Sequence, residues 1–317
     1  MIDTVNRLQR LQWEKFEKRG VALYVWREDL NHPDISGNKW YKVAHHLNKA
    51  VEAGCSHVVS MGGPWSNHLH ALAAACHEAN VAVTGMVRGD ALRFLSPTLE
   101  DALAWGMDLK FVDFETYREL RNVGAEHPQI QAMGRHHYFI PEGGSDAAIS
   151  QAFKPLVTAI ERHIDADYWV CPTGTGGTFA GLVHHAAPKT CILGVQAVAE
   201  GEATVQRISP WLQQAGADAN WQLWQQFHRG GFGKVDTQLR YFIDAVQQHF
   251  ALPLDPIYNG KTLLALSQAL DQGFFQSGEQ VVMIHTGGLQ GCRGMARVSQ
   301  NERDDPDART WLRHWDF

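Results

Sequence analysis

The segment Pro172-Thr173-Gly174-Thr175-Gly176-Gly177-Thr178 has the composition of a phosphate-binding loop. It follows an apolar run that ends at Cys171 and precedes a helical pattern. Glycines expose successive backbone N–H groups, and a helix N-terminus adds partial positive charge, so an anion is favoured there. A triphosphate-binding loop would need Gly-Lys-Ser/Thr, and a dinucleotide fingerprint that starts at Gly174 would need glycine in place of Phe179. The loop therefore predicts a site for one phosphate group, although a ligand-free turn would have a similar composition.

Other glycine-rich segments occur at comparable positions along the chain. They are Met61-Gly62-Gly63-Pro64, Pro141-Glu142-Gly143-Gly144-Ser145 and His285-Thr286-Gly287-Gly288. Each is suited to close approach by the backbone, and ligands of parallel sheets bind beyond the carboxyl ends of strands. Several such loops in one chain indicate a bound ligand rather than a set of unrelated turns.

The elements that must position these loops alternate between short apolar runs and helical patterns. The expected strands cover residues 22–26, 57–61, 81–87, 108–112, 168–171, 191–195 and 281–285. The expected helices cover residues 8–16, 39–53, 66–79, 95–105, 179–185 and 262–270. This alternation is typical of βαβ units and a mainly parallel sheet. The fold class expected is α/β.

Composition favours a soluble protein of the cytoplasm. The chain has 317 residues, enough for about two domains. Its net charge is −6 and its basic residues are scattered, which argues against nucleic acid or a membrane as a partner. The cysteines are odd in number and well separated, as in proteins of a reducing compartment. We find neither a signal peptide at the N-terminus nor an apolar run of about 18 residues.

Other common chemistries find little support. The adjacent pairs His45-His46, His136-His137 and His184-His185 would not share a helix face, and no H-E-x-x-H is present, so we expect no metal site. Ser66 lies in Gly63-Pro64-Trp65-Ser66-Asn67, which is not the G-x-S-x-G elbow of a serine hydrolase.

The glycine-rich loops acquire a specific meaning beside Ser36-Gly37-Asn38-Lys39 and Ser66-Asn67-His68. Together with Asp255-Pro256-Ile257-Tyr258-Asn259-Gly260-Lys261, these segments occur in an order that resembles the tryptophan-synthase-β type of pyridoxal phosphate enzymes. More narrowly, the chain resembles the 1-aminocyclopropane-1-carboxylate deaminase / D-cysteine desulfhydrase family, from about residue 27 to residue 288. The resemblance implies the two-domain α/β fold of fold type II, with parallel sheets flanked by helices. It places a larger cofactor-binding domain at residues 1–50 and 152–317, a smaller inserted domain at 51–151, and a homodimer.

The resemblance also implies roles for individual residues. Lys39 would carry pyridoxal 5′-phosphate as a Schiff base and act in catalysis with Ser66 and Tyr258. The other implied cofactor contacts are Lys42, Asn67, Gly174, Thr175, Gly176, Gly177, Thr178 and Thr286. The implied substrate contacts are Ser66, Asn67, His68, Phe232 and Tyr258. In isolation Ser66 could simply cap a helix, Tyr258 could be a core tyrosine, and Thr286 could close a turn.

Physical reasons support several of these roles. A lysine near a phosphate site and a helix N-terminus has a lowered pKa, which makes its neutral amine available. Lys42 lies one helical turn after Lys39 and offers a counter-charge to the phosphate. Thr286 offers a neutral hydroxyl to the pyridine nitrogen, and we expect this to favour elimination over transamination.

The choice of reaction depends on departures from the family pattern. Where the family has Gly-Tyr-Gly, this chain has Gly231-Phe232-Gly233, so one hydroxyl is absent. Deaminases of the family tend to carry glutamate at the position of Asn259 and leucine at that of Thr286. Loss of an acid–base group typically lowers a rate by about 10²–10⁴-fold. We therefore expect α,β-elimination from D-cysteine or a similar β-substituted amino acid, giving a 2-oxo acid and ammonia, ahead of 1-aminocyclopropane-1-carboxylate ring opening.

Two alternatives come from other classes. A nucleotide-dependent oxidoreductase is disfavoured by Phe179, which replaces the fingerprint glycine. A non-catalytic protein that binds pyridoxal phosphate or an amino acid is disfavoured by Lys39, Asn67 and Tyr258, although Phe232 is compatible with it.

Overall fold

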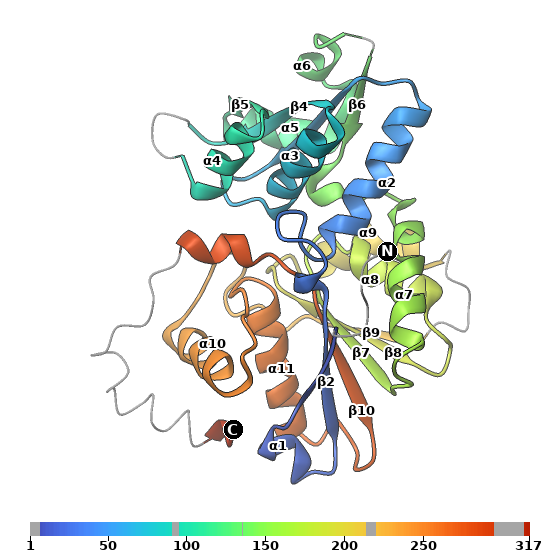
Figure 1. Ribbon diagram of the computed structural model, residues 1–317, viewed down its shortest axis with the longest axis vertical. Coiled ribbons are helices and arrows are strands. Elements are labelled where there is room, and N and C mark those ends of the chain that lie inside the picture. The colour runs from blue at the N-terminus through green and yellow to red at the C-terminus, as the bar shows by residue number, and fades with distance from the viewer. Residues whose placement is uncertain (1–6, 91–94, 135, 214–219, 295–313) are drawn as a thin grey trace.

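The computed structural model describes residues 7–90, 95–134, 136–213, 220–294 and 314–317. Its strands form a six-stranded sheet in the order β1-β2-β10-β7-β8-β9 and a four-stranded sheet in the order β5-β4-β3-β6. Figure 1 shows these sheets toward opposite ends of the long axis of the molecule, with helices around each. The α/β class and the mainly parallel sheets predicted from the sequence are confirmed.

The six-stranded sheet joins the beginning of the chain to its second half. Its strands are β1 (Leu8–Leu11), β2 (Ala22–Arg27), β10 (Gln280–His285), β7 (Tyr168–Thr173), β8 (Cys191–Gln196) and β9 (Trp221–Trp224). All neighbours pair in parallel except β1, which is antiparallel to β2. Buried side chains of α10 (Thr237–Phe250) and α11 (Asn259–Asp271) form a core on one face, and those of α7 (Lys154–Glu161), α8 (Gly177–His185) and α9 (Glu202–Gln213) form a core on the other. Both faces are covered, which explains the continuous apolar strands.

The four-stranded sheet is wholly parallel. Its strands are β5 (Asp108–Val112), β4 (Ala82–Arg88), β3 (His57–Gly62) and β6 (His137–Ile140). One core includes residues of α2 (Lys39–Glu52), α3 (Asn67–Ala79) and α4 (Pro97–Ala104), and a smaller core includes residues of α5 (Phe114–Val123) and α6 (Pro128–Gln131). All strands of this sheet lie within the segment 51–151, although the exact domain limits stay a prediction.

The start of the chain corrects one expectation. The spacing of Leu8, Leu11 and Phe16 predicted a helix, but Leu8–Leu11 is strand β1 and only α1 (Glu14–Glu17) is helical. Two apolar residues three positions apart do not distinguish a helix from a strand in so short a segment. The pairing of Leu8–Leu11 with β2 makes this segment a strand. The helical prediction was wrong because a long-range contact outweighed a local pattern.

The strand ends place the glycine-rich loops where a ligand would bind. The loops after β3, β6, β7 and β10 begin at or just beyond the carboxyl ends of these strands. Helix α2 contacts both α3 and the 3₁₀ segment η4 (Ile149–Phe153), and Figure 1 shows it beside the four-stranded sheet with one end directed toward the six-stranded sheet. Among the described residues, no helix is both long and apolar enough to cross a membrane.

Candidate active site

The phosphate loop has the geometry that its sequence predicts. The first hydrogen bond within α8 runs from Ala180 N to Gly176 O, so the N–H groups of Gly177 and Thr178 precede the intrahelical ladder. Gly176 has φ +92°, and a Cβ atom there would lie 2.1 Å from Ile208 Cγ2. Only glycine fits this position, and the loop therefore presents bare backbone donors at a helix N-terminus.

Lys42 reaches the same loop from α2. Its side chain is 2% exposed, and its partners are neutral oxygens: Gly143 O at 3.0 Å, Ser145 Oγ at 2.7 Å and Thr175 Oγ1 at 3.4 Å. Burial and the nearby charge of Lys39 hold the pKa of Lys42 well below its usual value. No carboxylate among the described residues forms an ion pair with it. A buried ammonium with only neutral partners is poised to receive an anion.

Lys39 opens α2 and is partly buried. Its Nζ donates to Asn38 Oδ1 at 2.9 Å, and Asn38 Nδ2 donates to Thr178 Oγ1 at 2.7 Å. This chain of contacts links the lysine to the phosphate loop. Burial lowers the pKa of Lys39 to about 8, against an opposing effect from the charge of Asp255. The neutral amine is therefore far more populated near neutral pH than it is in an ordinary lysine, although the ammonium form is still in the majority.

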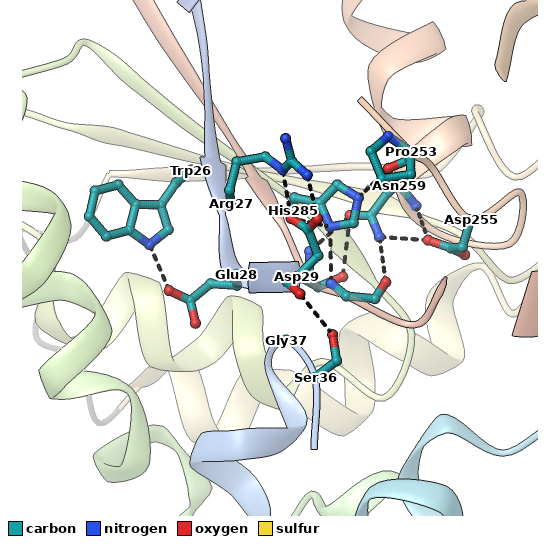
Figure 2. Close-up of polar contacts among 12 residues, drawn as sticks. Trp26, Arg27, Glu28, Asp29, Ser36, Gly37, Pro253, Asp255, Asn259 and His285 are labelled. Atoms are coloured by element: carbon teal, nitrogen blue, oxygen red, sulfur yellow. Dashed lines mark hydrogen bonds and ion pairs between the residues drawn. The ribbon is translucent and has the colours of Figure 1, made fainter. Parts of the chain in front are cut away.

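The loop before Lys39 is held by a buried polar network, shown in Figure 2. Gly37 has φ +71°, and a Cβ atom there would lie 1.9 Å from Thr286 O, so the loop approaches the end of β10 at backbone distance. Asn38 N donates to that same carbonyl at 3.2 Å. Asp29, whose carboxylate pairs with both Arg27 Nε (2.8 Å) and Nη2 (2.6 Å), accepts from Ser36 Oγ through its carbonyl at 3.5 Å. Lys39 is thus positioned by contacts that fix its preceding turn.

The end of β10 is organised by Asn259 and His285. Asn259 Oδ1 accepts from Thr286 N at 2.9 Å and Thr286 Oγ1 at 3.4 Å, while its Nδ2 donates to Gly287 O at 2.9 Å and Asp255 Oδ2 at 2.5 Å. His285 Nδ1 accepts from Gly287 N at 3.2 Å, and its Nε2 lies 2.8 Å from Pro253 O. Asp29 Oδ1 also lies 3.4 Å from His285 Nδ1, so the imidazole bridges the loop before Lys39 and the end of β10. Figure 2 shows Asn259 between Asp255 and the strand end.

Tyr258 lies against the phosphate loop, and Phe232 lies against Tyr258. A Cβ atom at Gly174 would lie 3.1 Å from Tyr258 Cε1, which shows how closely this ring approaches the loop. The rings of Phe232 and Tyr258 meet edge to face, with centroids 6.4 Å apart, and Phe232 is 55% exposed. Burial raises the pKa of Tyr258 above its usual value, and the charge of Asp255 adds to the effect, so its hydroxyl stays protonated at neutral pH.

Ser66 and Asn67, at the start of α3, make different contacts. Ser66 Oγ caps the helix by accepting from Leu69 N at 3.2 Å, which leaves its own proton available to donate. Asn67 accepts from Gln290 Nε2 at 2.9 Å and lies against Gly288, beside the loop that carries Thr286. Gln290 belongs to the 3₁₀ segment η5 (Leu289–Gly294), which follows β10, so this hydrogen bond connects α3 to the segment after the six-stranded sheet.

His68 is turned inward. It is 2% exposed, and its Nε2 lies 2.8 Å from Ser60 Oγ. Ser60 Oγ also lies 2.9 Å from Ile140 O, and the buried Nδ1 of His68 has no partner in the described part of the chain. Burial and the charges of Lys39, His46 and Lys42 lower its pKa well below the usual value. The predicted contact of His68 with substrate stays a prediction.

The structure adds positioning residues that sequence reasoning missed: Asn38, Ser145, Asp255, Asn259 and Lys261. Asn38, Ser145 and Asp255 occur in the recognised motifs without an assigned role, Asn259 entered only as a departure from the family pattern, and Lys261 ends one of those motifs. The signal that could have revealed them is their position, because each lies inside or beside a motif whose other residues were predicted to contact the ligand.

Known proteins resemble the chain over most of its length. A family model described as pyridoxal-phosphate dependent enzyme matches residues 4–287. A Pyrococcus abyssi protein provisionally named 1-aminocyclopropane-1-carboxylate deaminase is 27% identical over 287 residues, which are 86% of each chain. The D-cysteine desulfhydrase of Salmonella paratyphi A is 26% identical over 291 residues, 85% of this chain and 87% of that protein. The crystal structure of an ACC deaminase homologue superposes with a TM-score of 0.78 at 24% identity and covers 90% of each chain, which shows the same fold.

Proposed function

Because the chain belongs to the family of pyridoxal-phosphate-dependent enzymes, we propose that it catalyses α,β-elimination from D-cysteine or a similar small β-substituted amino acid. The products from D-cysteine would be sulfide, pyruvate and ammonia. Relatives named D-cysteine desulfhydrase and 1-aminocyclopropane-1-carboxylate deaminase support a small amino acid as substrate.

The donors of the site fit the cofactor. Lys42 is a buried cation that contacts only neutral oxygens, and the loop from Gly174 to Thr178 supplies N–H groups at a helix N-terminus. Both are suited to a phosphate dianion. Lys39 has a partly buried amine of lowered pKa for attachment of an aldehyde. Asn67 at the start of α3 and Thr286 after β10 offer neutral polar groups. Asn67 would contact the phenolic oxygen of the cofactor ring, and Thr286 would face its pyridine nitrogen.

When bound, the cofactor supplies an acceptor for the electrons released at the substrate α-carbon. The chain's own groups would perform the remaining work. Lys39 Nζ, once exchanged for the substrate amine, takes the α-proton. Ser66 Oγ donates to the substrate carboxylate with the proton that its capping contact leaves unused. Tyr258 keeps its proton at neutral pH because its pKa is raised by burial and by Asp255, so its hydroxyl can donate a hydrogen bond to the leaving group.

The observation that carries the choice of elimination is the pair of rings near the phosphate loop. Of Phe232 and Tyr258, only Tyr258 carries a hydroxyl, and the rings lie 6.4 Å apart. Elimination from D-cysteine needs one base and one acid, which Lys39 and Tyr258 supply. Opening of a cyclopropane that lacks an α-proton needs a further base or nucleophile, and Phe232 cannot provide it.

The test is a direct comparison of substrates. Purified protein saturated with pyridoxal phosphate is assayed for sulfide and pyruvate from D-cysteine and L-cysteine, and for 2-oxobutanoate from 1-aminocyclopropane-1-carboxylate, with Lys39→Ala as the control. We expect sulfide and pyruvate from D-cysteine and none from Lys39→Ala. Turnover of the cyclopropane substrate without turnover of D-cysteine would establish the alternative deaminase. Tight cofactor binding without turnover of any amino acid would establish a binding protein.

We further propose a cytoplasmic homodimer with the domain limits inferred from the sequence. Light scattering of the eluting holoprotein tests the oligomer, and cell fractionation tests the location. Limited proteolysis near residues 50 and 151 tests the limits of the inserted domain.

A further inference from the structure

Lys261 is a buried lysine outside the cofactor contacts proposed above. It is 1% exposed and lies in the first turn of α11. Its Nζ donates to Ala197 O at 3.2 Å, His228 O at 2.9 Å and Gly231 O at 2.8 Å. These bonds use all the donors of an ammonium group. No carboxylate in the described ranges forms an ion pair with it, so its direct partners are carbonyl oxygens, and the charges of Asp255 and Asp236 act on it from farther away.

The three carbonyls belong to two segments that end near the candidate site. Ala197 follows the last residue of β8, and its N–H donates to Thr173 O at 3.0 Å, just before the phosphate loop. His228 and Gly231 belong to the loop that carries Phe232. A Cβ atom at Gly231 would lie 3.1 Å from Ala199 Cβ, so this loop also packs against the segment after β8.

The loop needs such an internal support. Arg229, Gly230, Gly231 and Gly233 all have positive φ, with values of 52°, 86°, 108° and 72°. Glycines lose much conformational freedom when they are fixed. A further attachment involves Arg229, whose Nε donates to Asp236 Oδ2 at 2.7 Å and whose Nη2 donates to Gln238 Oε1 at 2.8 Å. Lys261 instead holds the inner side, directly before Phe232.

We propose that Lys261 is a positioning residue whose ammonium ties the loop 228–231 to the end of β8 and thereby holds Phe232 over Tyr258 at the substrate side of the site. The consequence for substrate rests on the proposed function: Phe232 forms an apolar wall that selects amino acids with an uncharged, polarisable β-substituent. Loss of the tie should weaken substrate binding more than it slows chemistry, because Lys261 touches neither Lys39 nor Tyr258.

Hydrogen-exchange mass spectrometry on the holoprotein tests the tie without turnover. In Lys261→Met, amides in the segment 228–233 should exchange about tenfold faster or more, the size expected for loss of a charge-assisted hydrogen bond, while α8 and β7 keep their protection. Lys15→Met is the matched control, because Lys15 is a buried lysine that bonds the other end of α11 through Ser267 and Asp271. It should leave the exchange of 228–233 unchanged.

The kinetic arm uses D-cysteine. Lys261→Met should raise KM about tenfold with kcat changed less than threefold, and Lys15→Met should change neither by more than about threefold. If Lys261→Met does not fold, Lys261→Gln, which can still donate to two of the carbonyls, should give intermediate exchange. Unchanged exchange in the loop, or equal acceleration throughout the protein, would overturn the proposal. Absence of D-cysteine turnover in the wild type would refute the proposed function and leave the exchange result valid.

Discussion

Asn259 Oδ1 accepts hydrogen bonds from both the backbone N–H and the hydroxyl of Thr286, at 2.9 and 3.4 Å. The amide is oriented by its other end, where Nδ2 must donate to Gly287 O. The same amide oxygen therefore fixes the backbone of Thr286 and contacts its hydroxyl at the strand end. A residue noted in the sequence only as a departure from the family pattern thus sets the hydrogen-bonding character of the strand end.

Asn259→Asp should destabilise the protein. The new carboxylate would face Asp255, whose Oδ2 lies 2.5 Å from Asn259 Nδ2, and Gly287 O would lose its donor. We expect the free energy of unfolding to fall by roughly 3 kcal/mol at pH 7. The loss should be smaller at pH 5, because a protonated aspartate can donate in place of the amide. Urea unfolding at both pH values measures this.

The control for that variant is Asn48→Asp, which makes the same chemical change at an exposed position of α2. It should change the free energy of unfolding by no more than about 0.5 kcal/mol. Equal unfolding midpoints for the two variants would contradict the role assigned to Asn259.

Attachment of the cofactor should follow the titration of Lys39. Its pKa is lowered to about 8, so the ammonium form dominates below pH 8 and the neutral amine dominates above it. Since only the neutral amine attacks an aldehyde, the rate of attachment to apoprotein should rise from pH 6.5 and level off a little above pH 8. Stopped-flow absorbance after mixing with pyridoxal phosphate reports the rate. A profile that keeps rising toward pH 10.5, as for an ordinary lysine, would disprove the lowered pKa.

Lys42→Met should separate cofactor affinity from the stability of the apoprotein. Removal of a buried ammonium that lacks an anionic partner should leave the apoprotein as stable as the wild type or more stable. Cofactor affinity should fall roughly 10- to 100-fold, because a charge-assisted contact to phosphate is lost. Thermal unfolding with and without cofactor, together with fluorescence titration, measures both effects. Lys49→Met, on the same helix, should alter neither by much, and an apoprotein destabilised by Lys42→Met would argue against an anion site.

Phe232→Tyr should restore the hydroxyl that ring opening is expected to need. Tyr258 lies edge to face with this ring, so the added oxygen would enter the same part of the site. If the missing acid–base group limits the reaction, 2-oxobutanoate formation from 1-aminocyclopropane-1-carboxylate should increase by about 10²-fold or more. Pyruvate formation from D-cysteine should change little. An equal rise or fall with both substrates would mean that Phe232 affects access rather than chemistry.

Local patterns predicted the central strands and the phosphate loop well. β3, β4, β7, β8 and β10 are short and largely buried runs, and these strands and the edge strand β5 were each expected within two residues of their observed limits. The other three edge strands were harder to predict. Leu8–Leu11 was predicted as helix, and β6 and β9 were not predicted, because edge strands of four residues with partly exposed side chains lack a clear apolar run.

The site shows the same division. The phosphate loop and Lys42 could be inferred because Lys42 lies three positions after Lys39, about one helical turn, and the glycines of the loop are close together in the sequence. The residues that hold the site in place, Lys261 and Asn259, could not be inferred from the sequence. Lys261 bonds residues 30, 33 and 64 positions away, and Asn259 bonds Gly287, 28 positions away. Such contacts depend on how the helices after β8 and before β10 return to the sheet, which no local pattern records.

The placement of Lys39 and Lys42 on the first turn of α2 has a mechanical consequence. A rigid helix fixes the separation of two groups on one turn, so the aldehyde-binding amine and the phosphate counter-charge cannot move apart. Ser66 and Asn67 start a different helix, α3. A displacement of α3 relative to α2 would therefore leave the separation of these two amines unchanged and alter only their distances from Ser66 and Asn67.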